Sequence, residues 1–133
     1  MIRRTLRIGR WLTYFLFVRD RYDKEMILSF LDTFGASDSV MERADKIMSD
    51  GFLNRGFTFA NPDLRRALVV TGPTSSGDEF LNSFSHELRH LADSIAKSIG
   101  YDLDAEEPAY MTGDAVRDLA EVVCELGCPH CHS

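Results

Sequence analysis

The hydrophobic pattern at the start of the chain predicts β-structure. Residues 5–8 and 11–18 are rich in β-branched and aromatic side chains, and Gly9 separates the two runs. We expect two short strands or one long bent strand here. The neighbouring arginines fit an outward-facing strand surface, and residues 11–18 are interpreted as a buried strand.

A helical period follows these strands. Hydrophobic residues recur three and four positions apart over residues 26–34, and Gly35 follows as a C-terminal stop. A second helix is expected to begin at Ser37 or Asp38, either of which can cap it, and to end at Gly51.

A hairpin is predicted in the middle of the chain. Residues 57–59 alternate between aromatic and polar side chains, and residues 61–63, Asn-Pro-Asp, are a turn signal. Residues 64–71 then contain a short apolar run that ends before Gly72.

The last part of the chain predicts two further helices. Ser76 and Glu79 fit a capping box. A hydrophobic stripe at spacings of three and four follows, on a helix ending near residue 98: Phe80, Phe84, Leu88, Leu91 and Ile95. The final helix is expected over residues 108–126, with Pro108 in its first turn. Together these elements predict one α+β domain over residues 1–133, a small, mostly antiparallel sheet packed with about four helices.

Charge and run length exclude some classes of function. The net charge of −6 argues against a nucleic-acid-binding surface, which needs a clustered basic excess. The apolar run 11–18 is too short to span a bilayer, and Arg19 and Asp20 follow it instead of a small-residue cleavage site. We therefore expect a cytoplasmic protein that binds neither nucleic acid nor membranes.

The third predicted helix carries His86, Glu87 and His90 in the sequence HELRH, which fits the HExxH pattern of zinc peptidases. Histidines four residues apart lie one above the other on a helix, so both rings can bind one metal ion. Glu87 would then lie beside that ion, placed to take a proton from a metal-bound water. All three residues fall off the hydrophobic stripe. The plain alternative is an amphipathic helix with two surface histidines.

A catalytic zinc site needs a third protein ligand. The chain offers these candidates: Asp93, Asp102, Asp104, Glu106, Glu107, His130 and His132. Glu106 and Glu107 begin the final helix, after a loop that lets this helix return along the motif helix, so either acid could be the ligand. Alternatively, both acids only complement the dipole of the final helix. Asp93 is interpreted as orienting a histidine ring or as a surface acid.

With this motif the chain resembles small zincin-type metallopeptidases that have a glutamate as third ligand, in particular uncharacterised short proteins of bacteria and their phages. The likeness covers residues 56–113, in which the HExxH part is specific and the flanking parts are loose. It implies a zincin-like domain in which zinc is bound by His86, His90 and Glu106, with Glu107 as the alternative ligand.

The resemblance also implies how a substrate binds. The strand at residues 67–71 would be an edge strand, where Val69, Val70 and Thr71 pair with a peptide by β-strand addition. Glu87 would act as general base, and Tyr110 would either stabilise the oxyanion or serve only in packing.

Three cysteines and two histidines crowd into residues 124–133: Cys124, Cys128, His130, Cys131 and His132. This odd number of cysteines is no disulfide framework and fits a flexible tail with free thiols in a reducing compartment. One CxxC pair is a weak signal for a structural zinc site. A tail histidine could also fold back and displace Glu106 as ligand.

The sequence therefore predicts a zinc-dependent metallopeptidase that acts on a peptide or protein substrate. The alternative is a non-catalytic zinc-binding protein on the same scaffold, regulatory or phage-associated. Glu87 favours catalysis, because a purely structural site needs no general base. The short chain leaves little material for a substrate lobe, so a protein partner could complete the cleft.

Overall fold

The computed structural model describes residues 1–100 and 106–127. Four strands and five helices follow one another in these ranges, which confirms the α+β class and places the HELRH motif on the third helix. In chain order they are β1 (Ile2–Ile8), β2 (Trp11–Phe17), α1 (Lys24–Thr33), α2 (Asp38–Asp50), β3 (Gly56–Asn61), β4 (Arg66–Thr71), α3 (Gly77–Ser98), α4 (Glu106–Asp118) and α5 (Ala120–Gly127).

The four strands form one mixed sheet in the order β1-β2-β4-β3. The pairs β1–β2 and β3–β4 are antiparallel, whereas the central pair β2–β4 is parallel. The chain leaves β2, passes through α1, α2 and β3, and returns as β4, which is the long crossover that parallel neighbours require. Two of the three pairs are thus antiparallel, as expected for a mostly antiparallel sheet, and the parallel central pair makes the sheet mixed.

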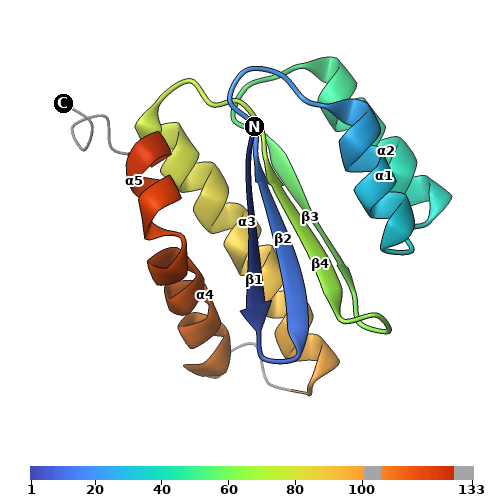
Figure 1. Cartoon of the computed structure of the whole chain (residues 1–133), viewed down its shortest axis with the longest axis vertical. Coiled ribbons are helices and arrows are strands. Elements are labelled where there is room, and N and C mark those ends of the chain that lie inside the picture. The colour runs from blue at the N-terminus through green and yellow to red at the C-terminus, as the bar shows by residue number, and fades with distance from the viewer. Residues whose placement is uncertain (101–105, 128–133) are drawn as a thin grey trace.

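Helices cover both faces of this sheet, as Figure 1 shows, with α1 and α2 on one face and α3, α4 and α5 on the other. Side chains of the two central strands alternate between the layers. Phe15 and Val69 face the side of α3, whereas Leu16 and Val70 face α1 and α2. Because both faces are buried, β2 and β4 read as nearly continuous hydrophobic runs.

The hydrophobic stripe of α3 packs on the sheet as its spacing predicts. All five stripe residues are buried. The helix begins at the predicted cap, where the Ser76 hydroxyl accepts a hydrogen bond from the backbone N–H of Glu79 at 3.1 Å. The polar face of α3, with His86 and His90, is therefore left exposed.

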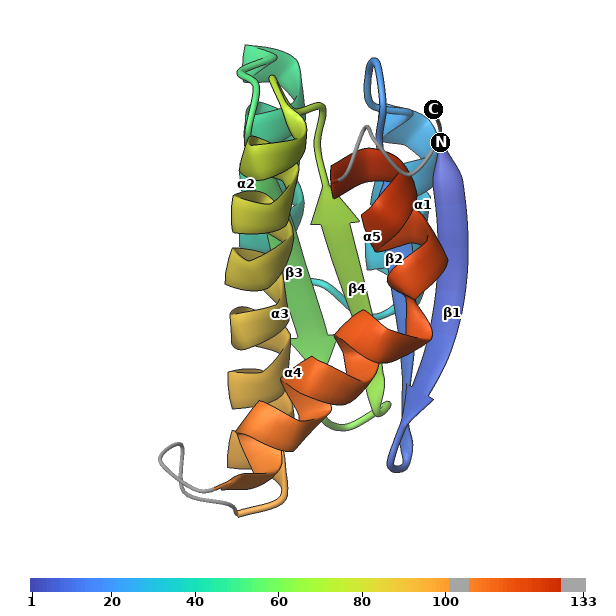
Figure 2. The same cartoon turned by 90° about the vertical axis from the view of Figure 1, so that its left-hand side faces the viewer.

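The predicted final helix is broken into two. Helix α4 ends at Asp118 and α5 begins at Ala120, so the expectation of one helix over residues 108–126 is wrong. The N–H groups of Val122 and Val123 both donate to the Leu119 carbonyl at 3.0 Å, a tightened turn that changes the chain direction. Leu119 and Val122 stay in the core on both sides of the bend, and Figure 2 shows α4 and α5 at an angle.

The chain beyond Val123 also differs from expectation. Residues 124–127 belong to α5 and not to a flexible tail. Cys124 is disulfide-bonded, which corrects the expectation of free thiols for this residue. Residues 128–133, with the remaining cysteines and both tail histidines, lie outside the described residues. Within the described ranges, no helix is both long and apolar enough to cross a bilayer.

Candidate metal centre

The two histidines of the motif converge on one point. The Nε2 atoms of His86 and His90 lie 3.1 Å apart, and the ring planes are nearly perpendicular at 87°. Two nitrogens bound to one tetrahedral zinc ion at about 2.0–2.1 Å would be separated by roughly 3.3 Å. The same spacing lets one neutral ring donate a hydrogen bond to the other. The spacing therefore fits both two ligands of one ion and a hydrogen bond between two neutral rings.

Unlike the two exposed histidines, Glu87 is buried, with 5% of its surface exposed. Its Oε1 accepts a hydrogen bond from the Thr58 hydroxyl at 2.8 Å. That hydroxyl is also 3.2 Å from the backbone carbonyl of Glu87, so it can serve either oxygen of this residue. Thr58 belongs to the edge strand β3, which thus fixes the position of the carboxylate.

A hollow of about 340 Å³ lies beside this carboxylate. It is bounded by Ile47 of α2, by residues 54–56 at the start of β3, and by α3, including Ser83, His86 and Glu87. The Ser83 hydroxyl donates to the carbonyl of Asn54 at 3.3 Å and so ties α3 to the loop that leads into β3. The first motif histidine and the motif glutamate therefore face a common open space.

Tyr22 contributes to the surroundings of Glu87. Its hydroxyl donates to the Arg55 carbonyl at 3.4 Å. Burial raises the pKa of Tyr22 above its usual range, the charge of Arg55 opposes this rise, and the charge of Glu87 adds to it. Tyr22 is thus protonated at neutral pH and can donate a hydrogen bond near the site.

The structure does not bring Glu106 or Glu107 to the histidines. Met111 of α4 packs against Leu91 and Ile95 of α3, on the flank turned away from the histidines. Glu107 lines a different cavity, which also contains Ile95 and Ile99. Figure 2 shows α4 on the β1 side of α3, whereas α3 itself lies beside β3. Over residues 1–100 and 106–127, no three His, Cys, Asp or Glu side chains form a metal-binding group.

Asp93 and Tyr110 have other neighbours than those expected. Both carboxylate oxygens of Asp93 accept from Nε of Arg89, at 2.9 and 3.1 Å, one turn away on the helix surface. This fits the surface-acid interpretation of Asp93. Tyr110 is 64% exposed and lines the same cavity as Glu107, on the far flank of α3.

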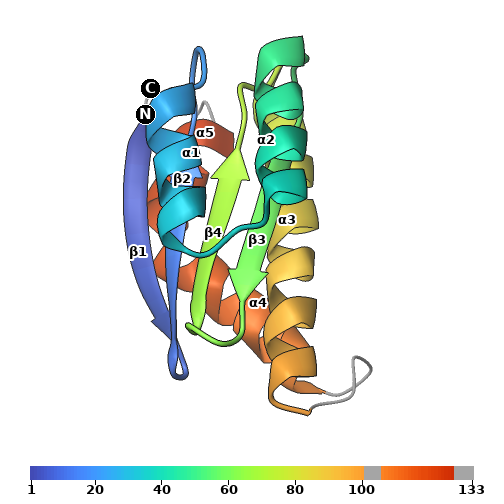
Figure 3. The same ribbon diagram turned by 90° about the vertical axis from the view of Figure 1, so that its right-hand side faces the viewer.

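The strand expected at the sheet edge is an interior strand. Val69, Val70 and Thr71 belong to β4, which is paired on both sides by β2 and β3, and all three are buried. Their backbone groups are used within the sheet, so β4 cannot accept an added strand. Figure 3 shows the strands in the order β1, β2, β4, β3, with β3 at the edge next to α3.

Two residues near Glu87 were missed by the sequence interpretation, Thr58 and Tyr22. Thr58 had one local signal, because it is the polar residue between Phe57 and Phe59 and its side chain must point to the opposite face of the strand. Tyr22 had none, since only the packing of the loop before α1 brings it near Glu87.

Comparison of the chain with protein-family models, with curated proteins and with solved structures finds no match.

Proposed function

We propose that this protein is a zinc-dependent peptidase in which His86 and His90 bind the ion and Glu87 is the general base. The observation that carries the proposal is the approach of the two Nε2 atoms to 3.1 Å next to a buried, positioned carboxylate. A site that only binds zinc needs no such acid, which favours catalysis over the non-catalytic alternative.

The donor set fits zinc, which takes neutral imidazole nitrogens at the spacing found for His86 and His90. When bound, the ion would supply Lewis-acid chemistry that acidifies water and polarises a peptide carbonyl. Glu87 takes a proton from the attacking water and delivers it to the leaving amine. Because Thr58 occupies Oε1, the other carboxylate oxygen handles the proton.

The third ligand remains a separate prediction. Glu106, or Glu107 in its place, is the ligand that the resemblance implies, although the structure does not bring either residue to the histidines. His130 and His132 are candidates by chain length, because the Gly127 carbonyl lies against Gly77 at the start of α3. The five residues from 127 to 132 can span up to roughly 17 Å. His86 lies nine residues along α3 from Gly77, or roughly 13 Å.

A peptide substrate is proposed to add to β3. The Arg55 carbonyl accepts from the Gly72 N–H at 2.7 Å, and hydrogen-bonded pairs alternate along an antiparallel ladder. The backbone groups of Thr58 and Ala60 therefore point away from β4, toward the open edge. β3 thereby takes over the role that was expected for β4. A protein partner could complete this cleft from outside. The cytoplasmic location of the protein also stays a prediction.

Metal content and turnover together test this proposal. We expect purified wild type to bind about one zinc ion per chain, and His86→Ala and His90→Ala to lose most of it. Lys97→Ala, an exposed change on the same helix, is the matched control. Equal zinc content in wild type and His90→Ala would show that the histidines are not the ligands. A Glu106→Ala/Glu107→Ala variant and a His130→Ala/His132→Ala variant, measured alongside, identify the source of the third ligand.

Catalysis is tested with Glu87→Gln, which keeps the side-chain shape and the acceptor for Thr58. We expect zinc binding to persist and cleavage of a quenched fluorescent peptide library to fall by at least about a hundredfold. If Glu87→Gln cleaves peptides as fast as wild type, the general-base role is wrong. If wild type binds zinc and cleaves none of the library, the non-catalytic alternative is favoured instead.

A further inference from the structure

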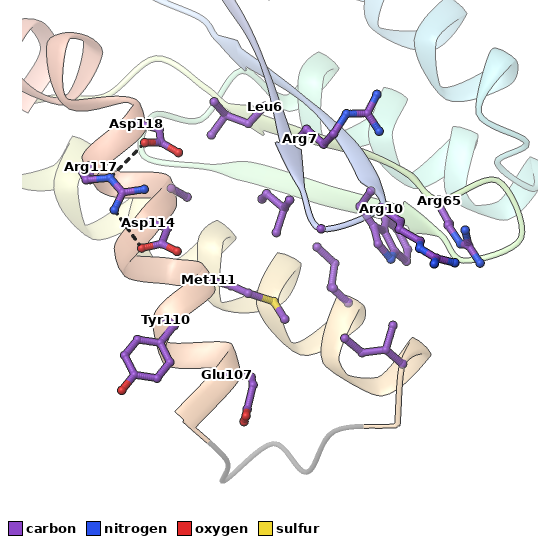
Figure 4. A pocket seen from close by; sticks show the side chains of 16 residues that line it. Leu6, Arg7, Arg10, Arg65, Glu107, Tyr110, Met111, Asp114, Arg117 and Asp118 are labelled. Carbon is purple, nitrogen blue, oxygen red and sulfur yellow. Dashed lines mark hydrogen bonds and ion pairs between the residues drawn. The ribbon is translucent and has the colours of Figure 1, made fainter.

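A second cavity lies on the opposite flank of α3, away from the HELRH motif, and its volume is about 740 Å³. It opens between the β1–β2 hairpin and helix α4, as Figure 4 shows. This volume is within the range of sites that hold small organic molecules.

The floor of this cavity is apolar. It is formed by side chains of β1, β2, α3 and α4: Leu6, Ile8, Trp11, Ile95, Ile99 and Met111. Ile99 is 52% exposed, although it is a large aliphatic side chain at the mouth of the cavity. An apolar surface left open in this way favours a ligand with an apolar body.

One lip of the cavity is cationic and has no counter-charge. Arg7 lines the cavity from β1, but it alternates with Leu6 and Ile8, so its side chain points to the other face of the sheet. Arg10 comes from the β1–β2 hairpin and Arg65 comes from the β3–β4 turn, and Figure 4 shows both at the same end of the sheet. Neither of their guanidinium groups makes an ion pair or hydrogen bond to another side chain in the described part of the chain.

The opposite lip, on α4, is acidic but partly neutralised. Arg117 lies 3.4 Å from Asp114 and 3.1 Å from Asp118. The cavity therefore has three arginine side chains, Arg10, Arg65 and Arg117, and three acids, counting Glu107, in a protein whose net charge is −6. An anionic group has the two unpaired guanidinium groups of Arg10 and Arg65 available. A cationic group would meet Asp114 and Asp118, which already share Arg117, and Glu107.

We infer that this cavity binds a small amphipathic anion, a fatty-acid-like carboxylate whose chain covers the apolar floor and whose head group pairs with Arg10 and Arg65. The guanidinium group suits this role because its planar fork can hold both oxygens of a carboxylate. The site is independent of the metal centre and does not rest on the proposed peptidase activity.

The single tryptophan of the chain makes the inference testable, because Trp11 lines the cavity and is 3% exposed. Decanoate, titrated at neutral pH, is expected to change the Trp11 emission saturably. Decyltrimethylammonium, which has the same chain and the opposite charge, is expected to bind at least about tenfold more weakly. The net negative charge of the protein would by itself give the reverse order.

Variants identify the head-group contacts. Arg10→Gln/Arg65→Gln is expected to weaken decanoate binding by about tenfold or more. Arg21→Gln/Arg43→Gln removes the same charge from exposed positions outside the cavity and should bind like wild type. Unfolding curves of both variants verify that they are folded.

Amide chemical shifts measured by NMR provide a second measurement, and we expect the changes to centre on Leu6, Ile99 and Met111. His90→Ala should leave decanoate affinity unchanged, which separates this site from carboxylate binding at the metal centre. The inference is overturned if the anion and the cation bind equally, if the Arg10/Arg65 variant binds like its control, or if decanoate does not bind saturably. Shift changes centred on His86 would overturn it as well.

Discussion

At the scale of single residues, Glu87 differs from the two histidines beside it because its side chain is buried against a strand. An acid in this position has to be hydrogen-bonded, since an unpaired buried carboxylate is costly. Thr58 provides that hydrogen bond at 2.8 Å. The interaction joins α3 to the edge of the sheet and keeps the carboxylate next to the hollow in front of His86.

Replacing Thr58 by valine tests this interaction, because valine has nearly the same shape and lacks the hydroxyl. We expect Thr58→Val to lower the free energy of unfolding by about 1–3 kcal/mol, measured by urea denaturation. Thr58→Ser keeps the donor and is expected to lose less. If the two variants are equally stable, the hydrogen bond does not stabilise the fold.

At the scale of elements, backbone approach decides where glycine is required. A Cβ on Gly72, at the end of β4, would overlap the Tyr22 hydroxyl and the Arg55 carbonyl. A Cβ on Gly113, within α4, would meet no atom within 4 Å. Gly72 is thus fixed by the close contact of three segments, whereas Gly113 is a helical position that any good helix former can occupy.

These two glycines predict opposite effects of the same substitution. Gly72→Ala is expected to lower the free energy of unfolding by about 1–3 kcal/mol, because the Arg55 backbone must shift. Gly113→Ala is expected to raise it by about 0.5–1 kcal/mol through the higher helix propensity of alanine. Thermal unfolding followed by circular dichroism measures both changes. A stabilising Gly72→Ala would contradict the packing described for Tyr22.

At the scale of the whole molecule, two hydrophobic cores share one sheet. Trp11 and Phe15 belong to the core on the side of α3, and Leu16 belongs to the core under α1 and α2. Neighbouring residues of β2 pack into different cores, so this strand links the helices on the two faces of the sheet. Loss of the helices on one face would expose buried side chains of β2. We therefore expect the three layers to unfold together.

Leu16→Ala tests this coupling across the sheet. It should lower the free energy of unfolding by about 2–5 kcal/mol. The emission of Trp11, on the other face, should report the same shifted midpoint in urea as the far-ultraviolet circular dichroism signal. A Trp11 transition that stays at the wild-type midpoint would show that the α3 side unfolds independently.

Local features of the chain were predicted well from the sequence. The start of α3 after Ser76, its buried stripe and the exposure of His86 and His90 follow from spacing and capping chemistry within one contiguous segment. The strands and the first two helices follow for the same reason. Sequence spacing also predicts that His86 and His90 can meet, since neighbours on a helix are fixed by its geometry.

Only the tertiary structure decided which segments become neighbours. Whether β3 or β4 lies at the edge depends on which strand pairs with β2, and a hairpin sequence is compatible with either. The bend at Leu119 and the contacts of Met111 with α3 likewise decide on which flank of α3 the helix α4 packs. As a result, Glu107 lies away from the histidines. The sequence by itself therefore determined a two-histidine motif with an adjacent acid. Long-range packing decided that Thr58 holds this acid, that β3 and not β4 is an edge strand, and that a separate cavity lies between the first hairpin and α4.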